Sequence, residues 1–201
     1  MFYEPSKGHG LPHDPFKALV SPRPIGWIST QAKDGSLNLA PYSFFNALGT
    51  NPHLVMFCSE GAKDSYTNAL ETGEFVANLV SSDLIEQMNA SSVDAPHGVS
   101  EFDYAGLTPE PSRIVRPPRV REAHAALECK VTEILRPKDL NGHATSRYMI
   151  IGQVVGVYIS DDALTDGMFD VVKAGNVARL GYLDFSSVKE VFQRTRPRWK
   201  D

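Results

Sequence analysis

The residues best suited to chemistry gather in the sequence SEGAKDS (59–65), which leads into a helix expected at 63–72. They are Ser59, Lys63, Asp64 and Ser65. A helix N-terminus offers backbone N–H groups and a favourable dipole to an anion, and Lys63 adds a positive charge beside it. The cluster therefore predicts a phosphate-binding site. A capped helix with a solvated lysine would give the same pattern and remains an alternative.

A second candidate is the aromatic segment 38–46, NLAPYSFFN, which has the composition of a strand. Pro41 cannot donate a backbone hydrogen bond, so we expect an edge strand or a bulge there, with nearby backbone groups left for a ligand. Ser29 and Thr30 fall on the preceding strand, within reach of the same ligand. A flat aromatic ring needs apolar walls and polar groups at its rim, and this hairpin offers both. A half-buried aromatic strand without a ligand is equally compatible with the segment.

The rest of the chain offers weaker signals. Arg179, in the sequence ARLGY at 178–182, is a candidate to bind a phosphate or a pyridine nucleotide, or to act as a structural ion-pair partner. The six histidines form no HExxH or HxH motif, and the sequence predicts no metal site. No GxGxxG motif and no Ser-His-Asp or Cys-His arrangement can be identified, so we assign no catalytic side chain. Among the histidines, His97 and His143 are expected in loops.

Composition narrows the class of protein. The 201 residues carry a net charge of −4 and are 42% hydrophobic and 22% charged, as in an ordinary globular domain. An acidic balance argues against a nucleic-acid partner, which would require a clustered basic surface. No apolar run approaches the roughly 20 residues that span a bilayer, and the first residues lack an apolar signal segment. We therefore expect a cytoplasmic protein with no nucleic-acid or membrane partner.

Periodicity predicts more strands than helices. Five Gly or Pro residues among the first 15 positions indicate an arm over residues 1–22, followed by one domain over residues 23–201. Strands are expected at 25–31, 38–46, 53–59, 75–79, 125–135 and 147–159, helices at 63–72 and 82–90, and mostly loop over 91–122. The connections between early strands are too short for repeated βαβ units. The pattern predicts a mainly antiparallel β domain, forming a closed or partly closed barrel with a few helices.

Four segments, in this order, resemble the flavin reductase-like family of FMN-binding split-barrel proteins. They are PRPIGWIST (22–30), NLAPYSFFNA (38–47), SEGAKDSYTN (59–68) and GEFVANL (73–79), with a weaker likeness at ARLGY (178–182). The resemblance implies an antiparallel Greek-key split β-barrel with peripheral α-helices. It also implies that Lys63 and Ser65 hold the FMN phosphate, and that backbone N–H groups of Ala40, Tyr42 and Ser43 lie near the flavin ring, with Asn46 lining the pocket.

The resemblance further implies an oxidoreductase. Hydride would pass from NAD(P)H, a transient substrate, to FMN, and electrons would then pass to a small-molecule or protein acceptor. A homodimer with FMN near the subunit interface is expected. Two alternatives remain: a flavin-carrying electron-transfer protein without NAD(P)H turnover, and a cofactor-free scaffold built on the same barrel.

Overall fold

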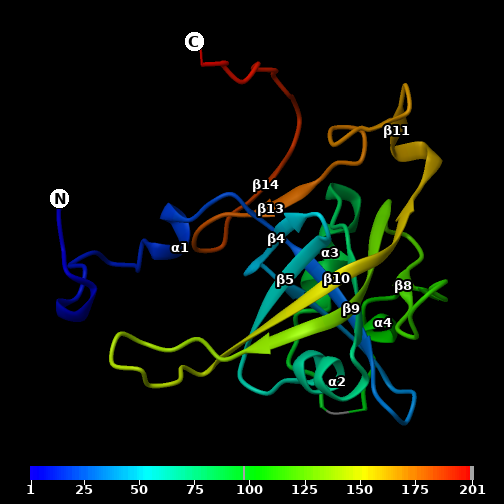
Figure 1. The fold of residues 1–201 in the computed structure, drawn as a ribbon, viewed down its shortest axis with the longest axis horizontal. Helices are drawn as coiled ribbons and strands as arrows, with labels where there is room; N and C mark the ends of the chain where they lie inside the picture. Colours follow the sequence, from blue (N-terminus) through cyan, green and yellow to red (C-terminus); the bar gives the residue numbers. More distant parts are fainter. Residues whose placement is uncertain (97, 200–201) are drawn as a thin grey trace.

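The computed structural model describes residues 1–96 and 98–199, and His97 lies outside them. Seven antiparallel strands form one curled sheet in the order β3-β2-β6-β9-β10-β5-β4 (Figure 1). The strands are β2 (Gly26–Gln31), β3 (Leu37–Tyr42), β4 (Phe45–Thr50), β5 (His53–Glu60), β6 (Glu74–Asn78), β9 (Ala125–Leu135) and β10 (Arg147–Ile159). The mainly β split barrel expected from the sequence is confirmed.

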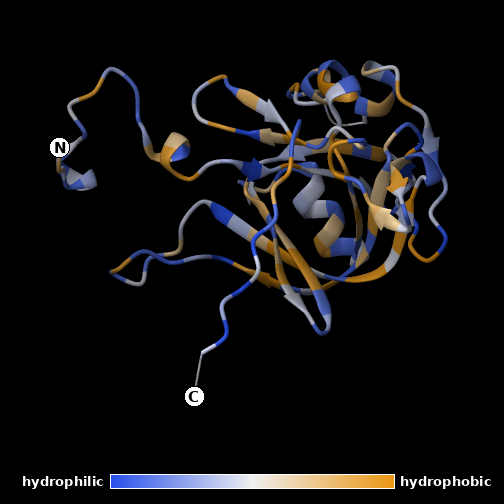
Figure 2. Ribbon diagram, turned by 90° about the horizontal axis from the view of Figure 1, so that it is seen from above, coloured by the Kyte–Doolittle hydropathy of each residue, from blue (hydrophilic) through white to orange (hydrophobic). Residues whose placement is uncertain are grey.

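The sheet curls because β3 and β4 follow one another in the chain yet form its opposite edges. Only Ser43 and Phe44 connect them, so the two edges must lie close together. The view from above shows this curl, with hydrophobic residues recurring along the strands (Figure 2). The ladder between β9 and β10 is irregular at two glycines, since its register shifts next to Gly152 and Gly156. At Gly152 a Cβ atom would lie 2.5 Å from the Phe75 ring, so only glycine fits.

Smaller elements surround this sheet. β1 (Arg23–Pro24), β13 (Val177–Arg179) and β14 (Phe185–Ser187) form a three-stranded sheet, and β7 (Pro109–Glu110) with β8 (Arg119–Val120) and β11 (Leu164–Thr165) with β12 (Met168–Phe169) form two pairs. The helices are η1 (Pro5–Lys7), α1 (Phe16–Leu19), α2 (Asp64–Thr72), η2 (Ser82–Leu84), α3 (Ile85–Ala90), α4 (Glu101–Tyr104) and η3 (Asp161–Ala163). The N-terminal segment and residues 188–199 extend away from the barrel (Figure 1). The division of the chain at residue 22 stays a prediction.

Both faces of β2 are buried because two hydrophobic clusters lie on opposite sides of it. Trp27 belongs to the cluster that contains Leu84, Met88 and Phe102, whereas its neighbour Ile28 belongs to the cluster around Phe57 and Phe75. Successive side chains of a strand point to opposite faces, so this one strand joins the two halves of the core. Among the described residues, no helix has the length and apolar character needed to cross a membrane.

Most expected elements appear, but one expectation was wrong in detail. Residues 38–46 do not form one strand: β3 ends at Tyr42, the chain bends, and β4 begins at Phe45. Residues 91–122 are mostly loop, as expected, interrupted by α4 and the two short strands β7 and β8. Pro41 lies on an edge strand, as one of the two alternatives required, and the register between β2 and β3 continues past it without a bulge.

Candidate functional site

A pocket of about 300 Å³ lies between the edge strand β3, the N-terminus of α2 and the segment that follows α3. This volume is at the lower limit for small-molecule sites. Predicted site residues that line it are Ala40, Pro41, Tyr42, Lys63, Asp64 and Ser65. The remaining lining residues are Asn38, Ser91, Ser92, Val93, Asp94, Ala95 and Glu101. The fold therefore brings the two candidate segments of the sequence into one pocket, which we call the main pocket.

The N-terminus of α2 gives the main pocket a site for an anion. Lys63 is the N-cap residue, and its side chain makes no capping hydrogen bond. First-turn N–H groups have no acceptor within the helix, so an anion placed there would be well received. Lys63 Nζ donates to Asp94 Oδ1 at 2.9 Å, and this hydrogen bond raises the pKa of Lys63 and lowers the pKa of Asp94. The Lys63 side chain is 56% exposed, so it can turn to a ligand.

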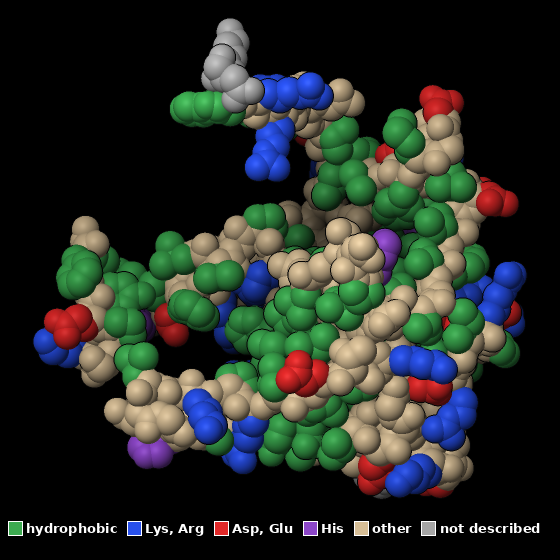
Figure 3. Space-filling model, in the orientation of Figure 1, with side chains coloured by type: hydrophobic (Ala, Val, Ile, Leu, Met, Phe, Trp, Pro, Cys, Tyr) green, Lys and Arg blue, Asp and Glu red, His purple; other side chains and the backbone are tan. Residues whose placement is uncertain are grey.

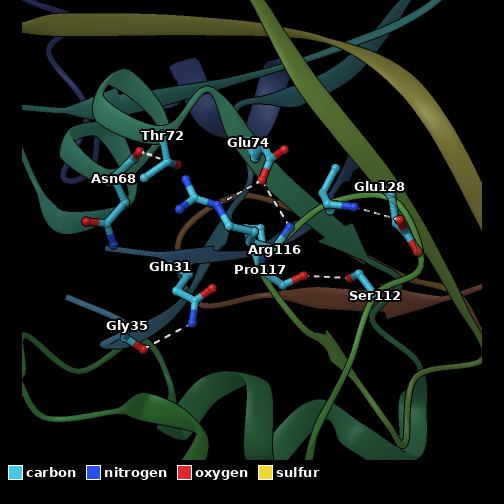
Figure 4. Close-up of polar contacts among 10 residues, drawn as sticks. Gln31, Gly35, Asn68, Thr72, Glu74, Ser112, Arg116, Pro117 and Glu128 are labelled. Atoms are coloured by element: carbon cyan, nitrogen blue, oxygen red, sulfur yellow. Dashed lines mark hydrogen bonds and ion pairs between the residues drawn. The ribbon is translucent and has the colours of Figure 1, made fainter. Parts of the chain in front are cut away.

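A buried polar network fixes Ser65 behind this helix terminus. Asn38 Nδ2 donates to Ser65 Oγ at 2.7 Å and to Thr30 Oγ1 at 3.4 Å. Asn68 Nδ2 donates to the same Thr30 oxygen at 3.1 Å. Figure 4 shows Asn68 in turn accepting, through its backbone carbonyl, the hydroxyl of Thr72. Thr30 is fully buried and therefore supports the pocket from behind without lining it.

The edge of β3 presents fewer donors than the sequence suggested. Leu39 N–H donates outward to Glu101 Oε2 at 2.9 Å, so the Ser29–Leu39 pair is not hydrogen-bonded. Hydrogen-bonded and non-hydrogen-bonded pairs alternate along the ladder. The backbone nitrogen of Pro41 therefore also faces away from β2, and the N–H groups of Ala40 and Tyr42 face β2. Pro41 therefore does not leave the N–H groups of Ala40 and Tyr42 for a ligand, as the sequence suggested, because proline occupies a position that needs no ladder bond.

Tyr42 closes the inner wall of the main pocket. Its ring packs against Phe57, with 5.0 Å between the ring centroids. Burial raises the pKa of the Tyr42 hydroxyl, and hydrogen bonds with Ser65 and Ser59 act in the opposite direction. Ser59 is fully buried, and its own hydroxyl donates to the Gly61 carbonyl at 3.0 Å. Ser59 therefore stands behind Tyr42 and does not line the pocket.

A second cavity of about 210 Å³ adjoins the main pocket, and Pro41 and Ser92 line both. Ser43 and Arg179 line the second cavity and not the main pocket, and Arg179 also lines a neighbouring cavity that includes Glu86. Arg179 Nη2 donates to the Tyr182 carbonyl at 2.6 Å, and its guanidinium lies 4.2 Å from the centroid of the Phe185 ring. The sequence-predicted residues thus form a continuous surface from Lys63 through β3 to Arg179.

Four predicted residues line neither cavity: Thr30 and Ser59, which stand behind the main pocket, and Ser29 and Asn46. Ser29 is fully buried, and its hydroxyl donates to the Pro118 carbonyl. The segment that carries Pro118 is held against the sheet by the carboxylates of Glu74 and Glu128, which accept N–H groups from residues 113–116 (Figure 4). Asn46 lies exposed on β4, and its side-chain oxygen accepts the N–H of the next residue.

Among the lining residues that were not predicted, two are acidic, Asp94 and Glu101. Glu101 is 7% exposed; burial raises its pKa, and the hydrogen bond from Leu39 N–H partly offsets this effect. Neither residue belongs to a recognisable motif, since each reaches the pocket through the folding of the 91–104 segment. Over residues 1–96 and 98–199, no group of three or more His, Cys, Asp or Glu side chains is arranged to hold a metal ion.

Comparison with known proteins agrees with this geometry. Residues 19–176 match the flavin reductase like domain family. A protein of Aquifex aeolicus, described as uncharacterized, is 38% identical over 169 residues, covering 81% of this chain and 83% of its own length. The chain therefore belongs to the flavin reductase-like family, a class of flavin-related oxidoreductases.

Two solved structures are similar to this fold. Nitrilotriacetate monooxygenase component B from Bacillus cereus has a TM-score of 0.87 and 26% identity, with 96% of this chain and 98% of that chain covered. The 2-nitrobenzoate 2-nitroreductase NbaA of Pseudomonas fluorescens has a TM-score of 0.80 and 28% identity, with 90% and 88% covered. In both cases nine-tenths or more of this chain is covered, so the similarity extends over most of the fold.

Proposed function

We propose that the chain binds FMN in the main pocket and transfers hydride from NAD(P)H to a small-molecule or protein acceptor by way of the flavin. The observation that carries this proposal is the pocket itself, which joins the aromatic edge of β3 to a helix N-terminus bearing Lys63. Membership of the flavin reductase-like family supports a flavin as the ligand. The two similar structures are named for a monooxygenase component and a nitroreductase, which is compatible with redox chemistry.

The residues present fit FMN at both ends. Lys63, the first-turn N–H groups of α2 and the Ser65 hydroxyl would hold the phosphate, which a helix N-terminus favours. The isoalloxazine ring would lie along Ala40, Pro41 and Tyr42 and extend toward Ser43 and the second cavity. Lys63 can contact a terminal phosphate, which FMN has and riboflavin lacks, so the pocket favours FMN over riboflavin.

FMN, when bound, supplies the hydride and electron chemistry, whereas the chain binds and orients it. The rigid edge strand fixes the position of the ring, because β2 holds the N–H groups of Ala40 and Tyr42 in the ladder. Ser43 is the first residue past β3, and the ladder between β2 and β3 ends at Tyr42. The backbone N–H of Ser43 is therefore not used in pairing with β2. We assign it to the polar rim of the ring and no side chain to acid or base catalysis.

Anaerobic spectroscopy tests this function. Purified protein is titrated with FMN, and its visible absorption is then followed after NADH or NADPH is added without oxygen. Bleaching of bound flavin at a rate above that of free FMN supports the reductase. Firm FMN binding without faster bleaching would identify an electron carrier instead. Failure to bind FMN would refute the proposal and favour a cofactor-free scaffold.

The same proposal includes a cytoplasmic homodimer. A surface cavity of about 300 Å³ is lined mainly by apolar residues, which include Phe45, Leu127, Val157, Ile159 and Phe169. Val157 is 61% exposed and Ile159 is 39% exposed. Hydrophobic side chains also gather across the face of the molecule shown in Figure 3. A second subunit would cover such a surface.

A further inference from the structure

The second cavity has a feature that flavin binding does not explain, since its charged lining residues are all positive. Lys17, Arg23 and Arg179 line it, together with the neutral polar residues Ser43, Asn89 and Ser92. No Asp or Glu is among the residues that line it. Within the described ranges, none of the three cations forms a salt bridge with a carboxylate. A concentration of like charge without a counterion is unfavourable and attracts an anion.

Arg23 is the fixed element of this cavity. It is 6% exposed, and its guanidinium donates to the carbonyls of Lys17, Val20 and Leu180. These acceptors are neutral, so the hydrogen bonds hold the guanidinium in place and leave its charge uncompensated. Arg23 Nε is buried and has no hydrogen-bond partner. Burial and then the charge of Arg179 lower the pKa of Arg23, which is the direction that an unneutralised pair of cations produces.

Lys17 and Arg179 are the adaptable elements. Arg179 is oriented by the Phe185 ring and the Tyr182 carbonyl, which leaves further guanidinium N–H groups for a ligand. Lys17 reaches the cavity because α1 packs closely on Gly181, where a Cβ atom would lie 2.4 Å from the Ala18 Cβ. The N-terminal segment is therefore docked at this point, and it brings a lysine to the cavity wall.

The second cavity is too small to be a second cofactor site. About 210 Å³ lies below the range of pockets for drug-sized ligands, but it can hold a phosphate, diphosphate or carboxylate group. The shared residues Pro41 and Ser92 place such a group next to the surface assigned to the flavin ring. A molecule with its reactive part over that surface would extend its anionic part toward Lys17 and Arg179.

We propose that the second cavity is the subsite for the anionic group of the second substrate, an oxyanion held by Lys17, Arg23 and Arg179. The proposal rests on the proposed function for its term "second substrate", but the anion site itself can be measured separately. Two sources share this chemistry: the diphosphate of a dinucleotide donor and the carboxylate of an organic acceptor. Arg binds both groups through paired hydrogen bonds.

Calorimetric titration with inorganic pyrophosphate, and separately with malonate, tests the subsite. The protein is first saturated with FMN, so that the phosphate site at Lys63 is filled. Lys17→Gln and Arg179→Gln each remove one charge, and each should weaken anion binding by roughly tenfold or more, the usual effect of losing a charged donor. Lys7→Gln is the matched control, because Lys7 lies on the same N-terminal segment, pairs with Glu4 and does not line the cavity.

The outcomes distinguish a diphosphate from a carboxylate ligand, and they test the subsite separately from the proposed function. Tighter pyrophosphate binding indicates a dinucleotide diphosphate, and tighter malonate binding indicates a carboxylate substrate; either supports the subsite. Binding of neither anion at millimolar concentration, or equal binding by wild type and both variants, overturns it while leaving FMN binding intact. If FMN does not bind but Lys17→Gln and Arg179→Gln still weaken pyrophosphate binding, the subsite stands and the proposed function fails. Circular dichroism of each variant confirms that the fold is retained.

Discussion

Replacing Lys63 by alanine is the most direct test of the phosphate end of the main pocket. A hydrogen bond to a charged group contributes about 1.5–3 kcal/mol. The Lys63 side chain is 56% exposed, so water screens its charge, and Asp94 competes for it at 2.9 Å. Both effects reduce the expected loss of binding free energy to the lower limit of this range or just below it, about 1–1.5 kcal/mol. FMN should then bind roughly five- to tenfold more weakly.

Fluorescence titration with FMN and riboflavin measures this effect. Riboflavin has no phosphate, so its binding should be the same in wild type and Lys63→Ala. Lys33→Ala is the matched control, because Lys33 is also an exposed lysine in an ion pair, with Glu71 at 3.5 Å, and does not line the pocket. We expect this control to bind both ligands normally.

Asp94→Asn should act in the opposite direction. Removing the competing carboxylate frees Lys63, and FMN binding should tighten by up to about fivefold, while riboflavin binding stays constant. Equal losses of FMN and riboflavin affinity in Lys63→Ala would show that the lysine supports the pocket and does not contact a phosphate. That result would refute the reasoning, whatever the effect of Asp94→Asn.

Three further predictions concern the edge strand and the outer surface. A carboxyl whose pKa is raised on folding contributes stability below its unfolded-state pKa, near 4.5, that is lost as pH rises through the folded pKa. Glu101→Gln, which can still accept the Leu39 N–H, should therefore flatten the pH dependence of Tm from pH 4.5 upward; an unchanged profile would contradict this. Ser43→Pro should slow flavin reduction roughly 10²-fold in stopped-flow measurements by removing one N–H, whereas Ser43→Ala should be mild, and equal rates would refute the backbone-donor assignment. Light scattering should give a mass near twice 22.1 kDa. Val157→Glu, in the apolar surface cavity, should lower this mass, whereas Leu70→Glu, at an exposed position on α2 outside the cavity, should not. A monomer that still binds FMN would contradict the dimer.

The sequence predicted the elements whose signals are local. The β9 and β10 strands were predicted at 125–135 and 147–159, the bounds that the structure has, because dense β-branched residues and flanking turns define them. The segment 38–46 was harder, because both of its halves have strand composition. The bend at Ser43 arises from closure of the barrel, which brings opposite edges together and leaves no mark in periodicity.

The candidate site divides in the same way. Lys63 and Ser65 were identifiable because a helix N-terminus has a sequence signature. Ser29 was placed on the expected strand, but its alternation points the hydroxyl to Pro118 on the other side of the sheet. Asp94 and Glu101 reach the pocket by long-range packing, and no residue near them in sequence indicates a ligand. The role of Pro41 depended on the phase of the ladder, which only the pairing with β2 determines.

The strand order has a consequence for synthesis of the chain. β2, β3 and β6 can pair with one another once residue 78 has emerged, and β4 can pair with β5. These two pieces meet in one sheet only through β9 and β10, since β10 pairs with both β9 and β5. In a nascent chain shorter than 147 residues these two pieces are therefore not joined by strand pairing, and each has unpaired strand edges. β10 completes the frame of the pocket, although it contributes no residue that lines it, so we expect a ligand-binding form only after nearly four-fifths of the chain, up to Ile159, has been synthesised.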